Sequence, residues 1–95
     1  MEKKEEILEL KDNILSLLEQ RRSHEVRQTL GDLYEADDAQ LLEELESAPA
    51  CQAFRLLPKD MAAGVFSYLE PESQQKLISL LSGAELEKIL EDMYG

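Results

Sequence analysis

Residues 53–69 read AFRLLPKDMAAGVFSYL, and the spacing of their apolar residues decides the fold. Two adjacent apolar residues, two variable residues and a third apolar residue form one unit, Ala53-Phe54-x-x-Leu57. The same unit returns twelve residues later as Val65-Phe66-x-x-Leu69. Positions i, i+1 and i+4 share one face of an α-helix. Each unit therefore predicts a short helix with a single apolar stripe.

This twelve-residue repeat continues on both sides of the opening stretch. Its further units are Leu41-Leu42-x-x-Leu45, Leu77-Ile78-x-x-Leu81 and Ile89-Leu90-x-x-Met93. All fifteen positions are apolar in a chain that is 43% hydrophobic, so composition alone does not explain the pattern. Helices of this length are unstable alone in water. We therefore expect an all-α solenoid of stacked short helices, each buried against its neighbours.

Proline and capping residues mark where the helices begin. Pro58 and Pro71 follow the ends of two units, and proline suits the first turn of a helix. Ser82 and Glu85 have the spacing of a capping box, and Ser47-Ala48-Pro49 marks another break. The expected helices span about 3–21, 24–33, 37–46, 49–57, 59–69, 71–81 and 84–93, and no strand is expected.

Residues 1–95 are expected to form one domain, with a longer helix over 1–21 followed by the short-helix array over 24–93. Because the array stops just after a full unit, we expect the chain to be a domain of a longer protein. The first helix carries Ile7, Leu10, Ile14 and Leu17 on one face. This stripe predicts either a coiled-coil partner or packing against the first turn of the solenoid.

The charge and the reactive side chains exclude several classes of function. A formal charge of −11 disfavours nucleic acid and anionic membrane surfaces, and favours basic partners or hard divalent cations. No apolar run is long enough to cross a bilayer, so no direct membrane insertion is expected. His24 and Cys51 are single residues of their kinds, without a recognisable catalytic or ligand motif. We expect that the chain is not an enzyme.

Residues 54–66 read FRLLPKDMAAGVF, residues 69–74 read LEPESQ, and residues 86–93 read LEKILEDM. These three segments resemble the N-terminal cytosolic domain of the MgtE family of magnesium transporters. The first is similar to the family's FRLLP signature with its paired alanine and valine, the second resembles its L-x-P-E-x-Q helix start, and the third resembles a later unit. The likeness covers residues 36–93 and depends on the order and spacing of these segments.

The resemblance implies a right-handed superhelix of about seven short helices that precedes a pair of CBS domains and a membrane domain on the same polypeptide. It implies a regulatory domain on the cytoplasmic side of the cell membrane. Docking of its acidic surface on the CBS domains would depend on Mg²⁺ and favour the closed pore. The resemblance also allows a homodimer of the parent protein.

The resemblance and the acids at turns and helix ends suggest a cation-facing set. Relatives commonly carry a glutamate after the alanine pair, where this chain has Gly64, so the expected Mg²⁺ site is incomplete here. Each remaining acid has a structural alternative, such as capping at a helix start or fraying at the chain end. The candidate metal ligands are Asp60, Glu70, Glu72, Glu91 and Asp92.

A second function stays open at this point. A magnesium-independent protein-interaction solenoid, similar to helical modules of the flagellar switch, would share the same short-helix style. It would bind a basic or apolar partner and be indifferent to magnesium.

Overall fold

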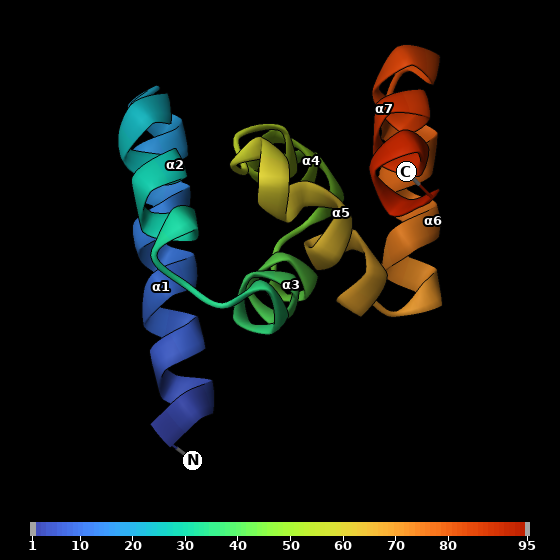
Figure 1. The fold of residues 1–95 in the computed structure, drawn as a ribbon. Coiled ribbons are helices and arrows are strands. Elements are labelled where there is room, and N and C mark those ends of the chain that lie inside the picture. The colour runs from blue at the N-terminus through green and yellow to red at the C-terminus, as the bar shows by residue number, and fades with distance from the viewer. Residues whose placement is uncertain (1, 95) are drawn as a thin grey trace.

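The computed structural model describes residues 2–94, and side chains over residues 5–91. It consists of seven helices joined by short turns, with no strand in the described range (Figure 1). The all-α prediction with seven stacked helices is therefore confirmed. The helices are α1 (Glu2–Glu19), α2 (Ser23–Gly31), α3 (Glu35–Glu44), α4 (Ser47–Arg55), α5 (Lys59–Tyr68), α6 (Pro71–Leu80) and α7 (Gly83–Tyr94).

Helices two apart in the sequence pack against each other. This holds for α1 with α3, α3 with α5, α5 with α7, and α4 with α6. In Figure 1 the α1–α2 pair lies at one end, α3, α4 and α5 lie in the middle, and the α6–α7 pair lies at the other end. The Cα radius of gyration is 12.5 Å, about the value expected of a packed chain of this length. Each short helix is thus stabilised by its neighbours.

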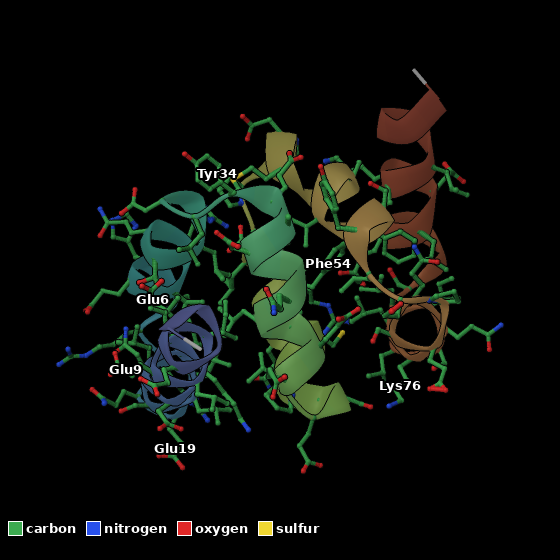
Figure 2. All side chains as sticks on the ribbon, turned by 90° about the horizontal axis from the view of Figure 1, so that it is seen from below. Glu6, Glu9, Glu19, Tyr34, Phe54 and Lys76 are labelled. Carbon is green, nitrogen blue, oxygen red and sulfur yellow. The ribbon has the colours of Figure 1, made fainter. Side chains whose placement is uncertain are left out.

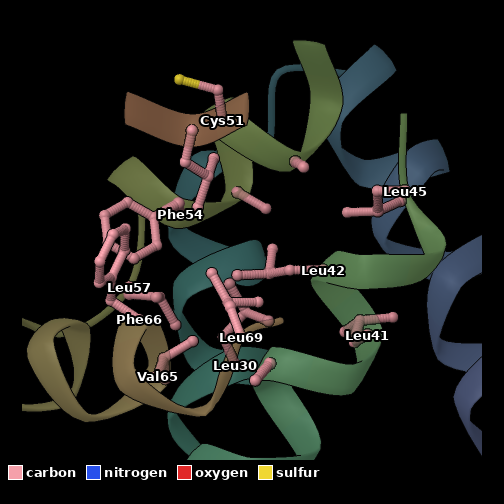
Figure 3. Packing of buried hydrophobic residues seen from close by; sticks show 14 of the residues in the cluster. Leu30, Leu41, Leu42, Leu45, Cys51, Phe54, Leu57, Val65, Phe66 and Leu69 are labelled. Carbon is pink, nitrogen blue, oxygen red and sulfur yellow. The ribbon is translucent and has the colours of Figure 1, made fainter. Parts of the chain in front are cut away.

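The core is built from the twelve-residue repeat. In the first three units every apolar position is buried, including Leu41, Leu42 and Leu45 of the first (Figure 3). The rings of Phe54 and Phe66 meet edge to face with centroids 6.1 Å apart, a favourable geometry for an aromatic pair. The repeat therefore predicts the core as well as the helices.

The last two units differ at their second position. Ile78 on α6 is 42% exposed and Leu90 on α7 is 49% exposed, whereas the equivalent Leu42 is 3% exposed. Helix α6 packs mainly against α4, and α7 mainly against α5, so each has a helical neighbour on one side. The second apolar position of the repeat is consequently buried in the middle of the stack and half-exposed at this end.

The helix ends differ from the prediction in a systematic way. In three units the third apolar residue lies just past its helix, not on it: Leu45, Leu69 and Leu81 have extended backbones with ψ near 150°. These side chains are nevertheless buried. An extended residue after the last turn directs its side chain back into the core and starts the reversal to the next helix. The expected helices 37–46, 59–69 and 71–81 therefore end one or two residues early.

The expected break at Pro49 is also wrong, because α4 already begins at Ser47. Pro49 stands in the first turn, where a backbone N–H would have no intrahelical partner and its loss costs little.

The stripe on α1 packs within the chain. Ile7, Ile14 and Leu17 are buried and Leu10 is half-buried, with α2, α3 and α4 as the neighbours of α1. Packing inside the stack, the second of the two alternatives for this helix, is therefore what the structure shows. None of the described helices is long and apolar enough to cross a bilayer.

Candidate functional site

The acids predicted to face cations are distributed over three helices. Asp60, in the first turn of α5, is exposed and lines a shallow hollow with Lys59, Gly64 and Lys88. Two lysines beside a carboxylate supply the positive charge that a cation would otherwise provide. The surroundings of Asp60 thus favour an anionic neighbour more than a metal ion.

Glu70 and Glu72 straddle Pro71 at the start of α6, and both are exposed. The side chain of Glu70 makes no capping hydrogen bond, although it occupies the N-cap. Its backbone N–H instead donates to Oε2 of Glu43 on α3, at 2.6 Å. The carboxylate that serves the start of α6 therefore comes from another helix, and no local sequence feature indicates this contact, since Glu43 is 27 residues away.

Glu91 is exposed on α7, and the side chain of Asp92 lies outside the described residues. Among the described residues, no three His, Cys, Asp or Glu side chains come close enough to hold a metal ion. Carboxylates are the ligands that Mg²⁺ prefers, so the donor chemistry fits the ion.

Gly64 stands where the resemblance leads us to expect a glutamate, and the structure places the carboxylate of another residue beside it. A Cβ built on Gly64 would overlap the carboxylate of Glu35, which reaches over from the first turn of α3. The two positions are far apart in sequence but adjacent across the α3–α5 contact. The carboxylate of Glu35 therefore lies over the surface of α5 at Gly64, a residue without a side chain.

Asp38 is fully buried in the first turn of α3, and sequence reasoning missed it. Among the described residues, neither carboxylate oxygen of Asp38 has a hydrogen-bond partner. Burial, and then the nearby charges of Asp37 and Glu35, raise the pKa of Asp38 to about 7. A buried carboxylate without a partner costs several kcal/mol in its charged form, so this residue opposes folding at neutral pH.

The best-defined polar contact joins α4 to the start of α7. Arg55 donates through Nε to Oε2 of Glu85 at 2.8 Å, and through Nη2 to the backbone oxygen of Leu80 at 3.2 Å. Oε1 of Glu85 accepts the backbone N–H of Ser82, and Oγ of Ser82 accepts the backbone N–H of Glu85. This reciprocal pair is the capping box predicted at Ser82 and Glu85, which is therefore confirmed. The hydrogen bond from Arg55, with the N–H of Ser82, lowers the pKa of Glu85 to about 2.

We expect two substitutions of Glu85 to separate its two roles. Glu85→Gln keeps an acceptor for the capping box but loses the ion pair, and should cost less than about 1 kcal/mol because the pair is partly exposed. Glu85→Ala loses both and should cost about 1–2 kcal/mol. In the wild type, the contribution of the charge is present above pH 4.5 and is lost as the pH falls toward about 2. Thermal unfolding followed by circular dichroism between pH 2 and pH 7 would show this acid-side loss in the wild type and not in Glu85→Gln. Equal losses in both would contradict the ion pair.

Comparison with known proteins adds one finding to this geometry. The model of the MgtE intracellular N domain matches residues 33–95, more than half of the chain. The chain belongs to this family. A search of curated proteins gives no match.

Membership of the MgtE N domain family indicates the general class of protein in which this fold occurs. These domains are the intracellular N-terminal parts of magnesium transporters. The matched part begins at Leu33 and contains α3 to α7, the helices that carry the twelve-residue repeat. The resemblance drawn from residues 36–93 is thereby confirmed.

Proposed function

We propose that this MgtE N domain regulates a magnesium transporter by docking its acidic surface on adjacent CBS domains when Mg²⁺ is present. Family membership supports the transporter context, and the charge of −11 supports the cation dependence. The observation that carries the proposal is the exposure of carboxylates at the start of α6 and on α7, with no group of three that closes a metal site among the described residues.

The physical basis is repulsion between like-charged surfaces. Two acidic domains on one polypeptide repel each other, and a divalent cation between them removes the repulsion. Mg²⁺ commonly keeps several waters and takes one or two carboxylates, so each domain need supply only part of a site. The partner would be the CBS pair of the same polypeptide, which precedes the membrane domain on the cytoplasmic side. A few kcal/mol of differential binding would then shift a two-state equilibrium between docked and undocked forms.

Proteolytic protection of a polypeptide that contains this domain and the following CBS pair would test the proposal. We expect about 10 mM MgCl₂ to slow cleavage between the domains, and NaCl at the same ionic strength to have little effect. The double substitution Glu70→Gln and Glu72→Gln should reduce the protection. It removes two exposed charges at the start of α6.

A matched control removes two charges from the other end of the stack. Glu6 and Glu9 are exposed on α1, well away from α6 (Figure 2). Glu6→Gln with Glu9→Gln should therefore leave the protection unchanged. Equal effects of the two double variants, or protection by NaCl, would show that general screening is at work and would contradict a docking surface on α6 and α7. Indifference to magnesium would favour the magnesium-independent interaction solenoid.

A further inference from the structure

A groove with a basic rim and an apolar floor lies on one side of the stack, and two of its rim residues, Lys59 and Lys88, also line the hollow that contains Asp60. Its volume is about 480 Å³, within the range of ligand sites in proteins. It lies between α2, the α4–α5 turn and α7. The floor residues are Phe54, Leu57, Pro58, Ala62, Leu81 and Ile89.

The rim concentrates positive charge on a strongly acidic protein. Arg27, Arg55, Lys59 and Lys88 line the groove, which is four of the ten lysines and arginines of the chain. Glu85 is the one acid among the lining residues of this groove. The local formal charge is thus +3, from four cations and one anion, on a chain of −11. Such a contrast favours an anionic partner at this place and disfavours it elsewhere on the surface.

Two of the four cations are held in place before any partner binds. Arg27 donates through Nε to the backbone oxygen of Leu56 at 3.1 Å. Arg55 is held by Glu85 and by the backbone oxygen of Leu80. Because these guanidinium groups are already ordered, a partner pays less conformational entropy when it binds them. Lys59, at the start of α5, is exposed on the same rim.

From this arrangement we propose that the groove binds an acidic amphipathic helix of a partner protein. Apolar side chains at i, i+3 and i+4 of such a helix would enter the floor, and glutamates beside them would meet Arg27 and Lys59 on the rim. A nucleic acid or an anionic membrane does not fit, since either would extend past the groove over acidic surface. A short helix with its charge next to one apolar face avoids that repulsion. The proposal does not depend on magnesium.

Fluorescence anisotropy with a designed peptide would test the proposal on the whole chain. The probe is a labelled helical peptide of about 16 residues, with leucines along one face and glutamates elsewhere. Its counterpart has lysine in place of every glutamate. We expect saturable binding of the glutamate peptide that weakens as salt is raised, and no binding of the lysine peptide in the groove.

Charge reversal on the rim supplies the matched comparison. Lys59→Glu should weaken binding about tenfold or more, because it replaces an attraction by a repulsion at the rim. Lys76→Glu makes the same change of net charge on α6, where Lys76 lies outside the lining of the groove (Figure 2). It should have a much smaller effect. Methyl chemical shifts give a second measurement that needs no variant: those of Ile89 and Leu81 should move on binding, and those of Ile78 should not.

Several outcomes would overturn the proposal. These are equal weakening by Lys59→Glu and Lys76→Glu, methyl shifts confined to Ile78, and absence of saturable binding. Displacement of the peptide by inorganic phosphate, at an ionic strength where NaCl does not displace it, would mean that the groove is a simple anion site.

Discussion

Asp38→Asn is expected to stabilise the chain by about 4 kcal/mol at pH 8 and to change its stability little at pH 4. The reason is the pKa of Asp38, which lies at 3.8 in the unfolded chain and at about 7 in the folded one. Between these values the folded state binds more protons than the unfolded state. The free energy of unfolding therefore falls as the pH rises from about 4 to about 7, and the loss is complete above that range. Asparagine has a similar shape and carries no charge, so the loss disappears.

Urea unfolding at a series of pH values would measure this effect as the difference between variant and wild type. Asp12→Asn is a suitable control, since Asp12 is exposed on α1 and its neutralisation should leave the pH profile almost parallel to that of the wild type. Parallel profiles for Asp38→Asn and the wild type would show that Asp38 is solvated or paired in the folded protein, contrary to its burial here.

Leu42→Ala is expected to destabilise the chain by about 3 kcal/mol, whereas Leu90→Ala should cost less than about 1 kcal/mol. Both leucines hold the second position of a repeat unit, and the same methyl groups are removed from each. Leu42 is 3% exposed in the middle of the stack, so its loss leaves a cavity. Leu90 is 49% exposed at the end of the stack, where water replaces the lost side chain.

Chemical denaturation of both variants gives the two values directly, with the slope of the transition as a check on two-state behaviour. Ile78→Ala, at the corresponding position of α6 and 42% exposed, should resemble Leu90→Ala. Similar costs for Leu42→Ala and Leu90→Ala would mean that the repeat is equally packed along its length and that the end of the stack is covered in solution.

The candidate site was less predictable than the fold, because its contacts join residues that are distant in sequence. The capping box at Ser82 and Glu85 was visible, since both partners lie within one helical turn. The contact between Arg55 and Glu85 depends on the packing of α4 near the start of α7, and no local feature of the sequence indicates it. The same holds for Glu43 at the start of α6 and for Glu35 over Gly64. Glu43 thus has a hydrogen-bond partner across the stack, and Glu35 lies against Gly64 on a neighbouring helix.

The sequence by itself determined that this chain is a stack of short helices with a leucine-rich core. An apolar spacing of i, i+1 and i+4 every twelve residues is a local property of the sequence. It fits the period of an α-helix and gives each helix one apolar face to bury. The order of three short segments was also enough to indicate the family. Only the tertiary structure decided which of the equivalent positions of the repeat are buried, because burial depends on how many neighbours a helix has. Leu42 is buried and Leu90 is half-exposed, although both hold the second position of a unit. It also decided that Asp38 is buried without a partner, and that four cations surround one apolar groove, since both follow from how separate helices meet.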